Sequence, residues 1–319
     1  MTTHDPRHIP VLLAPVLDAL DPQPGQTVVD CTTGLGGHAS ALLERVSPGG
    51  RVIGIDFDPA NLAVARGRLD AVADRLSAKR GTAADGFPAA RFYLFHNNFA
   101  ALPTVLTEAG AGRVDGVLAD VGVASTQIDD ASRGFSYRRP GPLDMRMDPT
   151  RGRPASALVN QLPERELAAA LLELGDETDA PQIAKLIVER RKRKPIETTE
   201  QLTAIVCEAR DFTLARAAGA KLHPAARTFQ ALRILVNREL ANLDRLLAVL
   251  PACLKPGGVA AIISFHSGED RRVKDAFRTG LRAGLYAEVS PDPIVADDVE
   301  QRANPRARSA KLRWARAAG

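Results

Sequence analysis

Residues Val28 to His38 read VVDCTTGLGGH, and this stretch decides the fold that the sequence predicts. An apolar run ends at Asp30, a loop with Gly34, Gly36 and Gly37 follows, and a helical pattern comes next. Glycine tolerates positive φ and lets the backbone approach a ligand without a side chain in the way. A glycine loop after a first strand is where α/β folds bind nucleotides and nucleotide-like cofactors. The stretch therefore predicts the first strand, loop and helix of an α/β sheet.

Two classes of cofactor fit this loop. Residues 34–39 match the dinucleotide pattern G-x-G-x-x-G/A, and Asp56 stands at the distance expected for a carboxylate that binds ribose. The pattern D-x-x-x-G-x-G, which begins at Asp30, is also the first motif of S-adenosylmethionine (SAM) methyltransferases. A βα turn without any ligand is a third interpretation. The loop alone does not decide between them.

Composition indicates a globular protein of the reducing cytoplasm. The 319 residues suffice for one large domain or two moderate ones, and 45% of them are hydrophobic. No apolar run is long enough to cross a membrane, and the first ten residues lack the apolar core of a signal peptide. Three widely separated cysteines with no CxxC pair argue against a disulfide framework and against a metal site.

Positive charge is concentrated in two places. The net charge is only +4, but residues 189–194 read ERRKRK, and a second cluster lies near the C-terminus. The second cluster consists of Arg302, Arg306, Arg308, Lys311, Arg313 and Arg316. Each cluster alone is compatible with an ordinary solvated surface. Together they favour a nucleic-acid partner.

The first 123 residues alternate between strand and helix patterns. Strands are expected at 26–32, 51–57, 91–97 and 114–123, helices at 38–46 and 61–76, and a surface loop at 77–90. Such alternation predicts a parallel sheet with right-handed crossovers.

The alternation stops near residue 130. Residues 130–150 carry turn-forming residues and no clean period, and a helical stretch follows. In it, Pro163 is expected to open a helix that Gly175 ends, and Thr198 with Gln201 has the spacing of a capping box.

The last part of the chain returns to the sheet pattern. A long helix is expected at 224–250 and a strand at 259–265. We therefore expect a sheet domain formed by residues 1–129 and 223–319, with an inserted helical domain at 130–222 that recognises the substrate.

Polar residues stand at the ends of all four early strands. Asp30 ends the first, Asp56 the second, Asn97-Asn98-Phe99 the third and Asp120 the fourth. Ligands of doubly wound sheets bind outside the carboxyl ends of the strands, so these residues predict one cofactor site. A pyrophosphate is disfavoured by Asp30 just before the loop, whereas the cationic sulfonium of SAM tolerates Asp30 and Asp120. The strand ends together favour SAM.

A family resemblance rests on motifs that run through the chain from about residue 8 to residue 314. In order they are HIPVLL (8–13), DCTTGLGGH (30–38), GIDFDP (54–59), HNNF (96–99), DVGVASTQ (120–127), RGFSYRRPGPLDMRMD (133–148), KPIETT (194–199), HPAARTFQALRILVNREL (223–240), ISFHSGEDRRVK (263–274) and NPRARSAKLR (304–313). These motifs resemble the bacterial 16S ribosomal RNA cytosine-N4 methyltransferases (the RsmH or MraW family). The chain departs from the family at Ala124, usually serine, at Gly268, usually leucine, and in a longer 77–90 segment.

The resemblance implies a Rossmann-like class I SAM-dependent methyltransferase sheet and a substrate. Its cofactor residues carry over as Gly36, Gly37 and His38 at the methionine end and Asp56 at the ribose, with Phe99, Asp120 and Gln127 completing the set. The implied substrate is cytosine 1402 of 16S rRNA within the assembled small ribosomal subunit, methylated on its exocyclic amine.

Catalytic and substrate-binding residues are expected from the same motifs. Asp120 is the first candidate to accept the proton of the amine, with His8 and His266 as secondary candidates. The target base must leave its stack to be methylated, and residues 133–148 are expected to close over it. There, Asp144 and Arg146 are candidates to read the cytosine, and Met145 and Met147 are more typical of packing.

The sequence also predicts phosphate contacts and leaves other functions open. Arg191 and Arg193 of the first basic cluster are expected to bind rRNA phosphates. A homodimer is left open by the sequence. The alternatives are a SAM enzyme acting on another RNA or on DNA, an NAD-dependent dehydrogenase, and an assembly factor without catalysis.

Overall fold

The computed structural model describes residues 10–80, 91–220 and 222–319. The chain divides into two compact units, the first formed by Met1–Gly122 with Ala241–Gly319 and the second by Val123–Leu240. This division places residues 123–129 and 223–240 with the helical unit, whereas the sequence pattern places them with the sheet.

The first unit contains a seven-stranded sheet. Its strands are β1 (Thr27–Asp30), β2 (Arg51–Asp56), β3 (Arg91–His96), β4 (Val114–Asp120), β5 (Leu254–Ser264), β6 (Tyr286–Val289) and β7 (Lys311–Ala317). Its helices are α1 (Leu13–Leu20), α2 (Gly37–Val46), α3 (Pro59–Arg80), α4 (Leu102–Glu108), α12 (Glu239–Cys253, which begins two residues before the boundary), α13 (Ser267–Arg282) and α14 (Asp298–Ala303), with 3-10 turns η1 (Phe99–Ala101) and η3 (Pro305–Ser309).

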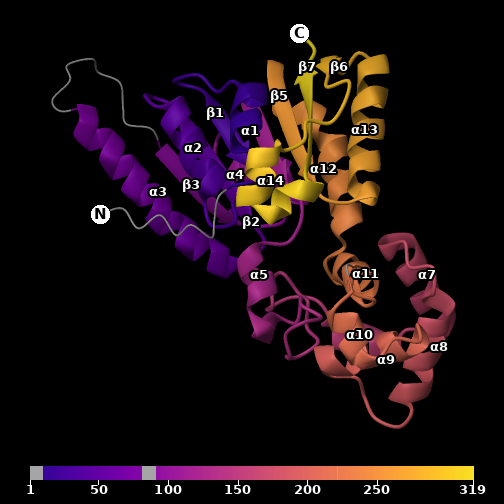
Figure 1. Cartoon of the computed structure of the whole chain (residues 1–319). Helices are drawn as coiled ribbons and strands as arrows, with labels where there is room; N and C mark the ends of the chain where they lie inside the picture. Colours follow the sequence, from indigo (N-terminus) through magenta and orange to yellow (C-terminus); the bar gives the residue numbers. More distant parts are fainter. Residues whose placement is uncertain (1–9, 81–90, 221) are drawn as a thin grey trace. The chain divides into compact units, whose positions relative to one another are not determined.

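The strand order confirms the predicted Rossmann-like α/β class. It is β3-β2-β1-β4-β5-β7-β6 (Figure 1), in which β1 to β5 run parallel and β7 pairs antiparallel with both β5 and β6. The chain adds β2 and β3 on one side of β1 and then adds β4 on the other side, so the direction in which strands are added reverses at β1. This is the position where doubly wound sheets bind their ligands.

Helices cover both faces of this sheet, as Figure 1 shows. On one face, α4, α12 and α13 pack against the strands, with Leu246 and Phe277 in the core. On the other, α1, α2 and α3 pack with Leu42 and Leu69. The strands β1, β2 and β4 are therefore buried on both sides, which explains their nearly continuous apolar sequences.

The second unit is helical. It contains α5 (Ser125–Asp129), η2 (Ala131–Arg133), α6 (Ala155–Gln161), α7 (Glu164–Gly175), α8 (Ala180–Arg191), α9 (Thr199–Ala209), α10 (Leu214–Ala218) and α11 (Ala226–Asn237). Its own core joins Leu143 and Met145 to apolar residues of α6 to α9 and α11. The predicted helix boundaries at Pro163 and Gly175 and the capping box of Thr198 with Gln201 are confirmed.

Two sequence-based boundaries are wrong. The helix expected at 224–250 is two helices, because Arg238 adopts left-handed φ of 52° and ends α11 before α12 begins. Apolar residues lie on both sides of this break, so the helical period hid it. The loop expected at 77–90 begins later, since α3 continues to Arg80, and the rest of that segment lies outside the described residues.

Within the described residues, no helix combines the length and apolarity that spanning a membrane requires.

Candidate active site

The ends of β1, β2 and β4 bring three aspartates to one edge of the sheet. Asp30 is in register with Gly54 of β2 and Leu118 of β4, so Asp56 and Asp120 follow two residues further along the neighbouring strands. The sequence predicted this convergence, and the register confirms it.

The glycine loop between β1 and α2 requires its glycines for the path of the backbone. Gly34 and Gly36 have φ of 52° and 82°, in the left-handed region that side chains disfavour. A Cβ at Gly37 would lie 2.6 Å from Cγ of Pro10, so α2 begins too close to the N-terminal segment for any other residue. The loop is thus fixed by conformation and by close packing within the protein.

Asp56 holds this loop in place. Its Oδ2 accepts a hydrogen bond of 2.6 Å from the Gly34 N–H, and its Oδ1 accepts one of 2.8 Å from the Asp58 N–H and one of 3.3 Å from the Asn61 amide. Burial raises the pKa of Asp56, and these hydrogen bonds act in the opposite direction. The carboxylate expected at the ribose therefore also orders the loop that precedes it.

Asp30 is buried with an incompletely satisfied carboxylate. Its Oδ1 accepts a hydrogen bond of 3.1 Å from the Thr32 N–H, while Oδ2 finds no hydrogen-bond partner in the described part of the chain. Burial, reinforced by the negative charge of Asp56, raises the pKa of Asp30 to about 7 against the hydrogen bonds from Thr32. A buried oxygen of this kind requires a partner, such as a bound ligand.

Asp120 repeats this pattern at the end of β4. Its backbone N–H donates to Thr32 Oγ1 at 2.6 Å, and its side chain keeps 24% of its surface exposed. Its Oδ1 is buried with no hydrogen bond to the described residues. Burial, followed by the charges of Asp30 and Glu269, raises the pKa of Asp120 to about 8. The two carboxylates therefore hold protons more tightly than ordinary aspartates.

His38, in the first turn of α2, lies beside Asp120 as a neutral imidazole. Its Nε2 is 2.9 Å from the Val11 carbonyl oxygen, which can only accept, so Nε2 carries the hydrogen. Its Nδ1 is 4.0 Å from Asp120 Oδ2. Burial lowers the pKa of His38 to about 4. The ring therefore brings no positive charge to the aspartates.

A fourth carboxylate, Glu269, approaches from the start of α13. It is buried, and its Oε2 accepts from the Phe265 N–H at 2.8 Å and from the His266 N–H at 3.4 Å. Its Oε1 lies 3.1 Å from His266 Nε2. His266 thus caps α13 next to an acid that acts electrostatically on Asp120.

A cationic ligand fits this arrangement. Asp30, Asp120 and Glu269 each keep a buried carboxylate oxygen with no hydrogen bond in the described part of the chain, and the charges of Asp30 and Glu269 both act on Asp120. The imidazole of His38 is neutral. Buried carboxylates with raised pKa are stabilised by a positive charge placed beside them. A dinucleotide would bring phosphates toward the same carboxylates, which is unfavourable.

Comparison with known proteins decides which class of protein this is. The MraW methylase family matches residues 5–318. The chain belongs to the MraW methylase family. The dehydrogenase alternative is therefore wrong, and the SAM motif, rather than the dinucleotide pattern, is the correct interpretation of the glycine loop.

Close relatives cover almost the whole chain. The protein named ribosomal RNA small subunit methyltransferase H from Heliobacterium modesticaldum is 43% identical and aligns over 97% of both chains. Those of the same name from Acidobacterium capsulatum and Geobacter sulfurreducens are 43% and 44% identical over 97% of this chain and 98% of each relative.

The remaining predicted cofactor residues of this MraW methylase have separate locations. Phe99 starts η1 and packs against the core of the first unit, and the amide oxygens of Asn97 and Asn98 accept from nearby backbone N–H groups. Gln127 belongs to the second unit, where its Oε1 accepts from the Ala124 N–H at 3.0 Å. His8, a secondary catalytic candidate, lies outside the described residues.

Asp144 and Arg146 form an ion pair in the second unit. Arg146 Nε and its terminal nitrogen donate to the two carboxylate oxygens of Asp144 at 2.8 and 2.7 Å. This bidentate pair lowers the pKa of Asp144 despite the desolvation that opposes it. Met145 between them is fully buried and Met147 is partly buried against the same core, as expected for packing residues.

The basic clusters of the methylase are less available than the sequence suggests. Arg191 donates to the carbonyl oxygens of Val159 and Leu162 at 2.7 and 2.8 Å, so its guanidinium holds the end of α6. Arg190 pairs with Glu208, whereas residues 192–194 are exposed. Arg193, unlike Arg191, is therefore placed to reach a partner.

Half of the C-terminal cluster pairs with acids inside the first unit. Arg313 is buried and bonds to Asp270 at 2.7 Å, and Lys311 lies 3.6 Å from the same carboxylate. Arg316 is 3.7 Å from Glu288. A linear count of charges could not show that these residues of β7 meet acids on α13 and β6.

The two single-residue departures from the family fall at helix starts. Ala124 is the N-cap of α5 and offers no side-chain oxygen, so only Gln127 closes the cap. Gly268 lies in the first turn of α13, where a Cβ would come within 3.2 Å of the His266 ring. The missing side chain therefore leaves room beside His266.

Sequence reasoning missed four residues that organise these sites. Thr32 bonds to both Asp30 and the Asp120 backbone, and Glu269 adds a fourth acid to the three aspartates. Arg133 and Asn237 bind the backbone around Met145. The signal for Glu269 was its position in the first turn of a helix that follows β5, but nothing local marked Arg133 or Asn237.

Proposed function

We propose that this methylase transfers a methyl group from SAM to the N4 amine of cytosine 1402 in the 16S rRNA of the small ribosomal subunit, in the cytoplasm. The family and the relatives' name support small-subunit rRNA as the substrate. The observation that carries the chemistry is Asp120, a strand-end carboxylate with a raised pKa and a buried oxygen without a donor among the described residues.

The residues of the first unit that would hold SAM are Gly34, Gly36, Gly37, His38, Asp30, Asp56, Phe99 and Asp120. When bound, SAM supplies a methyl group on a positively charged sulfur. Asp30 and Asp120 favour this cation, because its charge stabilises their ionised forms in a buried place. Gln127 is added to this set by the family resemblance.

Asp120 would act on the amine of the substrate. The lone pair of a cytosine amine is delocalised into the ring, so the amine must be held with its lone pair toward the methyl carbon. Asp120 accepts a hydrogen bond from the amine N–H and takes the proton that nitrogen loses when its new bond to carbon forms. Positioning of this kind contributes roughly 7–11 kcal/mol to lowering a barrier.

His38 and His266 support this step without exchanging the proton themselves. His38 stays neutral and keeps its Nδ1 lone pair near Asp120, so it does not compete with the substrate for the carboxylate charge. His266 is held against Glu269 at the start of α13. His8 keeps its place as a secondary candidate through the resemblance alone.

The substrate would be recognised by the second unit. Asp144 and Arg146 are proposed to contact the target base, and Arg193 with its exposed neighbours to contact phosphates. Arg191 is less suited to that role, because its donors serve backbone carbonyls.

Two measurements test the proposal. Isothermal titration calorimetry with SAM and with NAD should show binding of SAM alone. Methyl transfer from labelled SAM should be seen with small subunits and not with duplex DNA, and a parallel reaction with naked rRNA tests the need for an assembled particle. Binding of NAD, or label in DNA, would overturn the proposal. Light scattering of the same samples distinguishes a monomer from the homodimer that the sequence leaves open.

A further inference from the structure

The segment Asp144–Asp148 contains a strained residue, Met145. Met145 has φ of 62°, a left-handed conformation that is unfavourable for any residue with a Cβ. Its side chain is completely buried in the core of the second unit. Such a conformation persists only where the surroundings determine it, and it marks segments where geometry matters for function.

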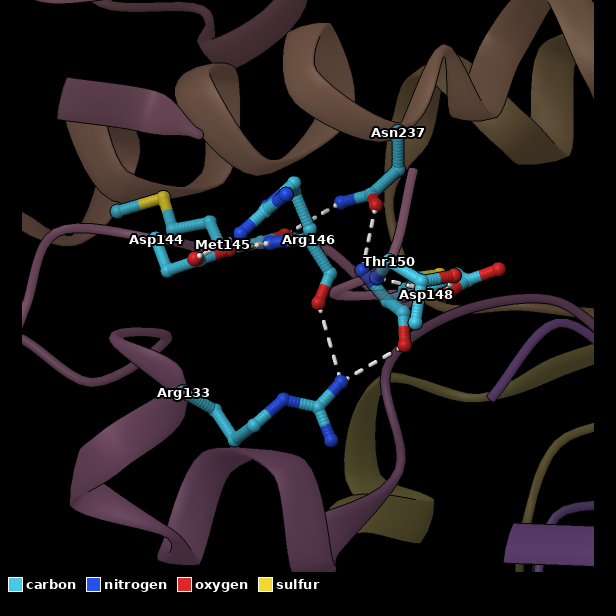
Figure 2. Close-up of polar contacts among 8 residues, drawn as sticks. Arg133, Asp144, Met145, Arg146, Asp148, Thr150 and Asn237 are labelled. Carbon is cyan, nitrogen blue, oxygen red and sulfur yellow. Dashed lines mark hydrogen bonds and ion pairs between the residues drawn. The ribbon is translucent and has the colours of Figure 1, made fainter. Parts of the chain in front are cut away.

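Two side chains distant in the sequence impose this conformation (Figure 2). A terminal nitrogen of Arg133 donates to the carbonyl oxygens of Arg146 and Met147 at 3.0 and 2.7 Å. Asn237, at the end of α11, donates to the Met145 carbonyl oxygen at 2.8 Å and accepts from the Met147 N–H at 2.8 Å. The backbone groups of three consecutive residues are thus bound by one arginine and one asparagine.

The ion pair of Asp144 and Arg146 lies at this bound backbone segment and is partly exposed. These side chains, on either side of the buried Met145, retain 23% and 22% of their exposure. A guanidinium has five N–H donors, and the bidentate pair uses two of them. Because Asp144 balances the charge of Arg146, the remaining donors suit neutral acceptor atoms of a nucleobase better than a phosphate.

We propose that Arg133 and Asn237 are positioning residues for substrate recognition. They fix the backbone of residues 145–147 so that Arg146, held by Asp144, presents its remaining N–H donors to the acceptor edge of a nucleobase. This inference rests on the proposed function. The sequence led us to expect that residues 133–148 close over the base. We infer instead that residues 145–147 already have their binding conformation before the base arrives.

Asn160 provides a matched control for Asn237. Asn237 donates to the carbonyl oxygens of Arg233 and Met145 and accepts from the Met147 N–H. Asn160 donates to those of Ser156 and Ile196 and accepts from the Ile196 N–H. Both lie in the second unit, and each joins the carbonyl four residues before it to a distant segment.

The test compares Asn237→Asp with Asn160→Asp, since each loses the donors and keeps the size. Both should lower the unfolding temperature. Only Asn237→Asp should raise KM for small subunits, by about tenfold, the effect of losing one good hydrogen bond to the base, with kcat and SAM affinity unchanged. An equal rise in KM in both variants, or none in Asn237→Asp, would overturn the inference.

A double-mutant cycle separates positioning from general stability. Arg133→Lys keeps a positive charge, but the lysine side chain ends one bond short of the terminal nitrogen with which Arg133 bonds both carbonyl oxygens, so KM should rise as in Asn237→Asp. In the background of Arg146→Ala, the same change should have little further effect on KM, because the side chain that it positions is gone. Additive effects on KM would contradict the inference.

Assays of the wild-type enzyme distinguish failure of the proposed function from failure of the positioning role. If wild-type protein transfers no methyl group to small subunits, the proposed function fails first. If wild type does transfer methyl groups, and KM changes equally in Asn237→Asp and Asn160→Asp, only the positioning role fails. Arg146→Ala should weaken subunit binding without changing its salt dependence, because a guanidinium that contacts a base releases few counterions. A reduced salt slope would show a phosphate contact instead.

Discussion

Asp30 and Asp120 keep their protons to unusually high pH, since burial and neighbouring carboxylates raise their pKa values to about 7 and about 8. Their identity and their common location at the sheet edge followed from the sequence, because each ends a predicted strand. Their contacts with Glu269 and Thr32 did not, because Glu269 comes from an element far along the chain and the motifs that contain these two residues do not show which groups they meet.

This protonation predicts how stability depends on pH. Above about pH 4 the unfolded chain releases the Asp120 proton, whereas the folded protein keeps it. The contribution of Asp120 to folding stability is therefore fully present below pH 4 and is lost as pH rises through about 8. Without SAM, the unfolding temperature should fall between about pH 4 and pH 8, and Asp120→Asn should flatten this fall. Differential scanning calorimetry measures it.

The exposed carboxylate of Asp18 provides the control for that experiment. Asp18→Asn should leave the wild-type slope unchanged. A slope that Asp120→Asn does not reduce would contradict the assignment of a raised pKa to Asp120.

At the scale of elements, strand positions were predictable because apolar runs with polar ends have only one way to lie in a buried parallel sheet. Helix ends were less so. The capping-box spacing of Thr198 and Gln201 predicted the start of α9, and this prediction is confirmed. The break between α11 and α12 was missed, because Arg238 has no local signal for a left-handed conformation.

Arg238 gives a test of that break. A left-handed residue with a Cβ costs roughly 1–2 kcal/mol, and glycine costs roughly 0.5–1 kcal/mol of chain entropy. Arg238→Gly should therefore raise the free energy of unfolding by about 0.5–1 kcal/mol, as measured by urea denaturation. Arg238→Ala, which keeps the Cβ, should give no such gain, and equal stabilisation by both variants would contradict the explanation.

At the scale of the whole molecule, the sequence predicted a basic protein with a nucleic-acid partner, but not which cations are exposed. Arg191 and Arg313 are used internally, whereas residues 192–194 are exposed. This difference arises from tertiary contacts that a run of charges along the chain cannot reveal.

Charge removal tests the exposed run. Arg193→Ala with Lys194→Ala should weaken binding to small subunits and reduce the slope of log affinity against log salt by about 1.4–1.8, which is roughly 0.7–0.9 for each phosphate contact. SAM affinity should not change. The exposed pair Arg278 and Arg282 on α13 offers a control with the same loss of charge. Equal slopes in both double variants would locate the rRNA elsewhere.

The central claim is that this methylase modifies one cytosine amine of small-subunit rRNA with the help of Asp120. Its most direct test is transfer of a labelled methyl group from SAM to small subunits, followed by mapping of the modified nucleotide, for wild type and Asp120→Asn. We predict label on N4 of cytosine 1402 with wild type and none with Asp120→Asn, while calorimetry shows that the variant still binds SAM. Label on another nucleotide, or wild-type turnover by Asp120→Asn, would contradict the account.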